Sequence, residues 1–257
     1  MSLQRTAADQ SVRADLRRLR ELGPLTHCIT NLVAAGFTAN VLLALGASPA
    51  MVLAAEEAAD FAAAADGLLI NVGTVTSDDV AAMTAAARSA QSAGTPWVLD
   101  PVAVGRLPYR TRLVDELLGY DPTVIRGNAS EILSLAGGAG GGKGPDSTAD
   151  SSQAISGARA LARRTGGVVA VSGAVDYVTD GDQTLEVPGG HMLLTKVTGT
   201  GCALGAVMAA FLAATDTALS AAVSASAVFA AAGERAAELA QGPGGMATAL
   251  LDSLYLL

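Results

Sequence analysis

The chain has 257 residues, of which 51% are hydrophobic and 4% aromatic, and its formal net charge is -8. This length fits one large or two small domains. No internal repeat or linker divides the sequence, and we predict a single domain over residues 1–257. The acidic balance argues against a nucleic-acid surface. It also means that a polyphosphate ligand would need a metal ion or local cations.

The cysteine content and the lengths of the apolar runs indicate the cellular setting. Cys28 and Cys202 are the two cysteines, too few for a disulfide framework. The first twenty residues include Asp9 and Asp15 and lack an apolar core run, so no secretory signal is predicted. The longest apolar stretch, residues 203–214, falls short of the roughly twenty residues of a spanning helix. We therefore expect buried helices in a cytoplasmic protein.

The predicted elements begin with an amphipathic helix at residues 11–22, where Val12, Leu16 and Leu19 share one face. The predicted strands span residues 25–30, 50–53, 68–72, 97–101, 124–127, 168–172 and 176–179. The predicted helices between them span residues 34–45, 55–65, 77–93, 109–118, 129–136 and 151–165, and the last third of the chain reads almost entirely as helix. This alternation predicts an α/β fold with a mostly parallel central sheet flanked by helices.

Two glycine-rich segments resemble nucleotide-binding motifs without matching them. The segment at residues 137–145 (GGAGGGKGP) predicts a mobile loop that could act as a lid. It is not a P-loop, because Gly144 stands where Ser or Thr is required and a helix precedes it. The spacing Gly199-x-Gly201-x3-Gly205 lies too late in the chain for a dinucleotide fingerprint.

The run KVTGTGCALG at residues 196–205 is the most informative segment of the chain. Its glycines and threonines lead into small apolar residues that predict a buried helix. A loop that opens a helix directs backbone N–H groups and the positive end of the helix dipole to one point, which predicts an anion site. Cys202 lies at that point, where a thiolate is favoured. A small buried residue at a helix start is an equally good interpretation of Cys202, and Cys28 is expected in the core.

Polar residues follow the predicted strands where each strand ends. Ligands of open parallel sheets bind outside the carboxyl ends of the strands, so we expect these side chains along one rim, with the helix start at residues 199–202 facing it. The rim residues are Asn31, Asn71, Asp100, Arg126, Asn128, Glu131 and Ser172.

The rim has the chemical balance of a phosphoryl-transfer site. Asp100 and Glu131 could hold Mg²⁺ directly or through water, since a hard cation prefers oxygen ligands. Arg126 provides a forked donor for a phosphate, and the glycine loop provides N–H groups for charge on a transferred phosphoryl group. Cys202 could stand where a substrate hydroxyl loses its proton. Such transfer requires mainly positioning and charge neutralisation.

Simpler interpretations of these residues stay open. Asp100 could cap the turn before Pro101, and Glu131 could be an acid that the helix dipole favours in a first turn. Lys143 and Lys196, the only lysines, both lie in or beside the glycine-rich loops, which chance explains equally well. His27 and His191 have no partner at ligand or triad spacing, which argues against a zinc site or a Ser-His-Asp site.

At these residues the sequence resembles the hydroxyethylthiazole kinase family of the ribokinase-like superfamily. The resemblance runs from about residue 24 to residue 232, and its ordered set of motifs is specific. The matching segments are HCITN at 27–31, FTANVLLALGASPAM at 37–51, LDPV at 99–102, IRGNASEI at 125–132, VSG at 171–173, DYVTDG at 176–181 and GTGCA at 199–203. The resemblance implies a three-layer ribokinase-like fold and ATP- and Mg²⁺-dependent phosphorylation of 4-methyl-5-(2-hydroxyethyl)thiazole in thiamine biosynthesis or salvage.

The resemblance also implies an assembly and residue roles. It implies a homotrimer with active sites between subunits. The acidic charge and the short apolar runs predict no nucleic-acid or membrane partner. It implies that Cys202 is a weak catalytic base, since related kinases usually carry Asp at its position. The implied binding residues are Met51 (from a neighbouring subunit), Gly199 and Asn31 for the thiazole; Arg126, Ser172 and Asn128 for ATP; and Asp100 and Glu131 for the metal.

Two positions depart from the family pattern, and three alternative functions stay open. Gly36 stands where relatives often carry Asn or a larger residue, which bears on the fit of the thiazole, and Pro145 stands where relatives tend to carry Val. The first alternative is a kinase for another small alcohol, such as a hydroxymethylpyrimidine. The second is an ATP-dependent hydro-lyase of the same fold. The third is a non-catalytic binding protein.

Overall fold

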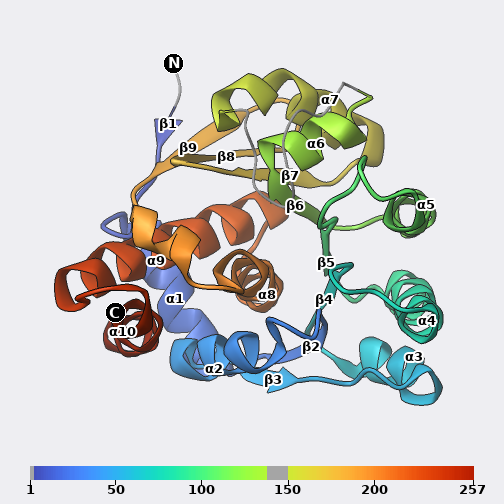
Figure 1. Ribbon diagram of the computed structural model, residues 1–257, viewed down its shortest axis with the longest axis horizontal. Coiled ribbons are helices and arrows are strands. Elements are labelled where there is room, and N and C mark those ends of the chain that lie inside the picture. The colour runs from blue at the N-terminus through green and yellow to red at the C-terminus, as the bar shows by residue number, and fades with distance from the viewer. Residues whose placement is uncertain (1–2, 138–149) are drawn as a thin grey trace.

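One sheet forms the centre of the computed structural model, which describes residues 3–137 and 150–257 (Figure 1). Within these residues the strand order is β1-β9-β8-β7-β6-β5-β4-β2-β3. All neighbouring strands are parallel except the antiparallel pairs β7–β8 and β8–β9. The strands are β1 (Leu3–Gln4), β2 (Leu25–Ile29), β3 (Ser48–Ala50), β4 (Gly67–Asn71), β5 (Trp97–Asp100), β6 (Val124–Asn128), β7 (Val168–Ser172), β8 (Val175–Thr179) and β9 (Thr184–Pro188).

Helices cover both faces of the sheet. Helices α1, α2, α8, α9 and α10 pack on one face, and α3 to α7 pack on the other. Successive strand residues point to opposite faces, so Leu69 enters the first apolar layer while Leu68 and Ile70 enter the second. The helices are α1 (Gln10–Leu22), α2 (Ala35–Leu45), α3 (Ala55–Ala64), α4 (Ser77–Ala93), α5 (Pro108–Leu117), α6 (Ala129–Leu135), α7 (Ile155–Thr165), α8 (Thr200–Leu212), α9 (Ala218–Leu239) and α10 (Pro243–Leu256).

The predicted three-layer α/β architecture is therefore confirmed, with local corrections. The strand predicted at 50–53 is β3, which lies two residues earlier on the sheet edge, where Pro49 is tolerated. The helix predicted at 151–165 begins as a separate 3₁₀ turn, Ser151–Ala154. The prediction that the last third is almost entirely helical is wrong at β9. There Leu185 and Val187 alternate with less buried residues, which is the period of a strand.

Helix α8 approaches the sheet closely because small residues line the contact. A Cβ atom on Gly67 would clash with the carbonyl oxygen of Ala209 in α8. A Cβ atom on Gly205 would lie 3.1 Å from Leu69 Cδ1 and 3.7 Å from Asp100 Oδ2. The helix therefore lies over the middle of the sheet, and its first turn reaches the carboxyl ends of the strands. In the described part of the chain, no helix is long and apolar enough to span a bilayer.

Candidate active site

Five of the predicted rim residues and Cys202 form one hydrogen-bonded chain along the rim, which we call the rim network. The network begins where Ser172 Oγ accepts a hydrogen bond from Arg126 Nε at 3.1 Å. It continues through Asp100, Asn71 and Asn31, and it ends at the sulfur of Cys202. The remaining contacts are Arg126 Nη1 to Asp100 Oδ2 (3.5 Å), Asn71 Nδ2 to Asp100 Oδ2 (2.8 Å), Asn31 Nδ2 to Asn71 Oδ1 (2.9 Å) and Asn31 Nδ2 to Cys202 Sγ (3.1 Å).

Sheet register explains why these residues meet. Asn71 pairs with Asp100 across β4 and β5, and Asn128 pairs with Ser172 across β6 and β7. Asn31 follows β2, the neighbour of β4 on its other side. Parallel strands end at the same edge of a sheet, so the last polar residue of each strand lies beside the next one.

Asp100 is the most deeply buried acid of the rim, with 1% of its surface exposed. Burial raises the pKa of its carboxyl group to about 7, the charge of Glu131 adds to the rise, and the guanidinium of Arg126 opposes it. The carboxylate forms an ion pair with Arg126 at 3.5 Å. Its second oxygen, Oδ1, has no hydrogen-bond partner in the described part of the chain.

The first turn of α8 has the geometry of an anion site. Gly199 is the N-cap, with a φ of 90° that favours glycine, and no side chain caps the helix. Among the described residues, no acceptor pairs with the backbone N–H groups of Gly201 and Cys202, as expected for the start of a helix. A Cβ atom on Gly201 would lie 3.1 Å from Nη1 and Nη2 of Arg126. A guanidinium and free N–H groups therefore lie together.

The thiol of Cys202 differs from the sequence-based expectation. Burial raises its pKa, the negative charge of Asp100 adds to the rise, and Arg126 and the amides of Asn31 and Asn71 oppose it. The predicted preference for the thiolate is therefore wrong in direction, because burial disfavours the charged form of this half-buried thiol. The neutral thiol predominates at neutral pH.

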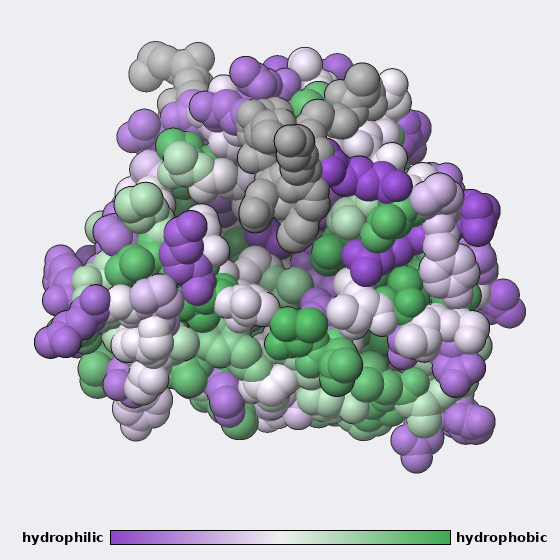
Figure 2. Space-filling view, in the orientation of Figure 1, coloured by the Kyte–Doolittle hydropathy of each residue, from purple (hydrophilic) through white to green (hydrophobic). Residues whose placement is uncertain are grey.

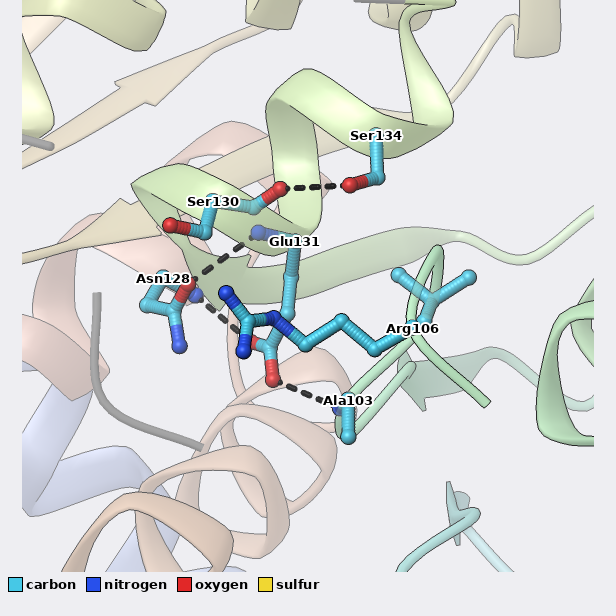
Figure 3. A pocket seen from close by; sticks show the side chains of 7 residues that line it. Ala103, Arg106, Asn128, Ser130, Glu131 and Ser134 are labelled. Atoms are coloured by element: carbon cyan, nitrogen blue, oxygen red, sulfur yellow. Dashed lines mark hydrogen bonds between the residues drawn. The ribbon is translucent and has the colours of Figure 1, made fainter. Parts of the chain in front are cut away.

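Glu131 acts as a structural clamp as well as a rim acid. Its Oε2 accepts the N–H of Asn128 and its Oε1 accepts the N–H of Ala103, both at 2.9 Å. Asn128 Oδ1 in turn accepts the N–H of Glu131, which completes a capping box at the start of α6 (Figure 3). The clamp holds Ala103 at a φ of 61°, in the left-handed region. Glu131 thus lies in the first turn of α6, and burial raises its pKa.

A cavity of about 450 Å³ opens beside the rim network. Asn31 and Cys202 of the predicted site line this cavity. Two arginines that the sequence analysis did not identify also line it: Arg106 from the loop after β5 and Arg110 from the start of α5. Arg106 also borders the capping box, where its side chain extends toward Glu131 and Asn128 in Figure 3. The residues that line the cavity are Asn31, Gly73, Thr74, Val102, Ala103, Arg106, Leu107, Arg110 and Cys202.

The other predicted positions lie apart from this cavity or outside the description. Met51 is half-buried, packs against the apolar layer of α8, and does not line the cavity. Gly36 is exposed in α2, and a Cβ atom there would meet nothing within 4 Å. Lys143 and Pro145 lie outside the described residues. The Nε2 atom of His27 lies 2.8 Å from the carbonyl oxygen of Val52.

The chain has the ribokinase-like fold. A ribokinase-like superfamily protein from Enterococcus faecalis V583 superposes with a TM-score of 0.65 at 13% identity, covering 98% of this chain and 91% of that one, which shows the shared fold. The sequence model of the Hydroxyethylthiazole kinase family matches residues 16–257. A hydroxyethylthiazole kinase of Leptospira interrogans is 57% identical over 243 residues, covering 95% of this chain and 92% of that one.

A solved structure agrees with these sequence matches. The hydroxyethylthiazole kinase from Pyrococcus horikoshii OT3 superposes with a TM-score of 0.88 at 41% identity, covering 97% of this chain and 94% of that one. The chain therefore belongs to the hydroxyethylthiazole kinase family and is a phosphotransferase.

Proposed function

We propose that this enzyme transfers the γ-phosphoryl group of ATP to the primary hydroxyl of 4-methyl-5-(2-hydroxyethyl)thiazole. The observation that carries the proposal is the meeting of Arg126, the free N–H groups at the start of α8, and Cys202 at one point beside the cavity. These groups can stabilise a transferring phosphoryl group next to a bound alcohol. We choose this alcohol as the substrate because the similar proteins are named hydroxyethylthiazole kinases.

The chemistry requires one bond exchange and one proton transfer. The alcohol oxygen forms a bond to the γ-phosphorus as the bond from that phosphorus to the ADP oxygen breaks. The hydroxyl proton passes to the ionised fraction of Cys202. This fraction is small because burial raises the thiol pKa, so Cys202 serves as a weak base. Most of the acceleration is assigned to Arg126 and the helix N–H groups, since phosphoryl transfer depends mainly on positioning and charge stabilisation.

The remaining rim residues are assigned to ATP and Mg²⁺. Arg126, Ser172 and Asn128 bind the triphosphate, and Arg106 adds a cation that has no hydrogen-bond or ion-pair partner in the described part of the chain. The described residues contain no cluster of three His, Cys, Asp or Glu side chains that could hold a metal. Mg²⁺ commonly binds one or two carboxylates, waters and the substrate phosphates.

The carboxylates fit such an ion. Asp100 Oδ1 is buried and has no hydrogen-bond partner among residues 3–137 and 150–257, and each oxygen of Glu131 accepts one backbone N–H and retains a further lone pair. Asp100 and Glu131 would therefore hold Mg²⁺ directly or through water, and the bound ion would supply charge neutralisation on the phosphates.

The proposed assembly is a homotrimer in which Met51 of a neighbouring subunit completes the thiazole site. Exposed apolar side chains support it: Leu32 is 85% exposed, and Val33 and Leu43 are each 59% exposed. Figure 2 shows hydrophobic surface gathered along the lower part of the molecule, over α2 and β3. Such a patch is typical of subunit contacts. Light scattering after size-exclusion chromatography would measure the mass, and a monomer would contradict the trimer.

The proposed reaction is tested with purified enzyme, ATP, Mg²⁺ and the thiazole alcohol. Coupled ADP release and mass spectrometry of the product should both report phosphorylation. Preference for a hydroxymethylpyrimidine in a panel of alcohols would support the other kinase. ATP consumption without a phosphorylated alcohol would support the hydro-lyase, and thiazole binding without ADP release would support a binding protein.

A further inference from the structure

Asn71 occupies the middle of the rim network and has no role in the proposed chemistry. It is fully buried at the end of β4. Its Nδ2 donates to Asp100 Oδ2 at 2.8 Å, and its Oδ1 accepts from Asn31 Nδ2 at 2.9 Å and from the N–H of Gly73 at 3.0 Å. Because backbone N–H groups can only donate, the bond from Gly73 fixes which end of the amide is oxygen.

A hydrogen bond from the backbone also fixes the orientation of the Asn31 side-chain amide. Its Oδ1 accepts the backbone N–H of Ala34 at 3.0 Å, so its Nδ2 faces the other way. The two hydrogens of that nitrogen are shared between Asn71 Oδ1 and Cys202 Sγ. Without Asn71, one buried N–H of Asn31 would lose its acceptor, and the amide would turn to find another.

Gly73 shows how tightly the two amides are held. A Cβ atom at this position would lie 2.9 Å from Asn31 Cβ and 3.0 Å from both Asn31 Nδ2 and Asn71 Oδ1. Only a glycine leaves room for the amide pair. An alanine would wedge Asn31 and Asn71 apart without removing a polar group.

We propose that Asn71 is a positioning residue for phosphoryl transfer, which holds the Asn31 amide so that one N–H faces the sulfur of Cys202. The inference rests on the proposed function of Cys202. In this arrangement the sulfur lies at the cavity with an N–H donor on one side, and its open side is available to the hydroxyl of the substrate. Asn71 itself touches neither substrate nor phosphate and acts through Asn31.

A double-mutant cycle tests this coupling. Asn71→Leu should lower kcat about tenfold to a hundredfold, the range for a misplaced reacting group. In a Cys202→Ala background the same change should cost less than about threefold, because the group that Asn71 positions is gone. Equal losses in both backgrounds would overturn the proposal. No thiazole phosphorylation by the wild-type enzyme would instead overturn the proposed function.

Two further variants distinguish a loss of positioning from a loss of folding. Gly73→Ala should reproduce the pattern of Asn71→Leu in both backgrounds. Gly119→Ala is the matched control, since a Cβ atom there meets nothing within 4 Å, and it should leave kcat unchanged. Full activity of a folded Gly73→Ala enzyme would contradict the proposal.

Alkylation of Cys202 by iodoacetamide, without ATP, provides a readout independent of activity. Cys28 stays silent because burial raises its pKa to about 12. At pH 8 the rate should fall about threefold to tenfold in Asn71→Leu, because loss of the amide donor raises the thiol pKa. Asn71→Leu retains both charged side chains that act on the sulfur, Asp100 and Arg126, although Asp100 Oδ2 loses the hydrogen bond from Asn71. An unchanged or faster rate would contradict the proposed orientation of Asn31.

Discussion

The two cysteines lie in regions of opposite character, the interior of the sheet and its carboxyl rim. Cys28 is fully buried in β2 among apolar residues, and the only partner of its thiol among the described residues is the carbonyl of Thr26, at 3.8 Å. Cys202 lies half-buried beside the cavity and accepts an N–H from Asn31. Burial raises the pKa of both thiols, yet only Cys202 has charged groups near it. Position at the strand ends, more than residue type, decides which thiol can take part in chemistry.

The same contrast applies to the other polar groups. In the sheet interior, side chains pack in two apolar layers, and the backbone groups of neighbouring strands pair with one another. At the rim, the buried carboxylate of Asp100 forms an ion pair with the half-buried Arg126, and its Oδ1 has no hydrogen-bond partner among the described residues. A buried carboxyl group with a raised pKa beside a specific cation at the strand ends is typical of a functional site.

Substitution of Arg126 should have the largest effect on the rim. Arg126→Gln removes the cation beside the first turn of α8 and leaves Asp100 without its ion pair, so kcat should fall about a hundredfold to a thousandfold. Steady-state kinetics with varied ATP would measure it. Arg112→Gln, an exposed change in α5 outside the cavity lining, is the matched control and should leave kcat within about twofold. A similar loss in both variants would mean that net charge, not the rim, is responsible.

Paired substitutions of the cysteines would sharpen the comparison directly. Cys202→Ala should lower kcat about tenfold to a hundredfold with a smaller change in the KM for ATP, as expected for loss of a weak base. Cys28→Ala should leave kcat within about twofold and reduce the free energy of unfolding by about 1 kcal/mol, because it leaves a small cavity. Kinetics and denaturant unfolding separate the two outcomes. A large loss of kcat in Cys28→Ala would contradict the conclusion that only Cys202 takes part in the chemistry.

Much of this arrangement could be predicted from the sequence, because strand ends carry a local signal. The apolar runs fixed β4, β5, β6 and β7 to within one residue, and parallel pairing then placed Asp100, Arg126 and Ser172 together. The order of contacts could not be predicted, because it depends on side-chain rotamers and on register. The raised thiol pKa was missed for a related reason. Desolvation depends on packing from distant segments, whereas the helix dipole can be inferred from local sequence.

Arg106 escaped prediction because it follows no strand and belongs to no motif. The Glu131 clamp on Ala103 shapes the loop that presents it, and this long-range contact has no sequence signature. Arg106→Gln should raise the KM for ATP about threefold to tenfold and make it less sensitive to salt, because an exposed cation contributes a screened attraction. Kinetics at two ionic strengths would measure both effects. Arg112→Gln is again the control, and equal KM values for Arg106→Gln and wild type would remove Arg106 from the site.

The smallest effect that we predict concerns the pH dependence of stability, and it involves His27 in the interior of the sheet. Its ring lies edge-on to Phe61, with centroids 5.1 Å apart, and its Nδ1 is buried without a partner in the described part of the chain. Burial lowers its pKa, and the hydrogen bond to the carbonyl of Val52 only partly opposes this. Below pH of about 6.5 the unfolded chain therefore binds a proton that the folded protein does not, and stability falls as the pH decreases.

The corresponding measurement is the dependence of Tm on pH between 7.5 and 5, a window of about two units around the usual histidine pKa. His27→Gln can retain the N–H donor to Val52 but does not titrate, so its Tm should fall less steeply with decreasing pH than that of the wild type, by a few degrees across the range. His191→Gln removes an exposed histidine and should follow the wild-type curve. Parallel curves for His27→Gln and wild type would show that the buried imidazole does not control acid stability.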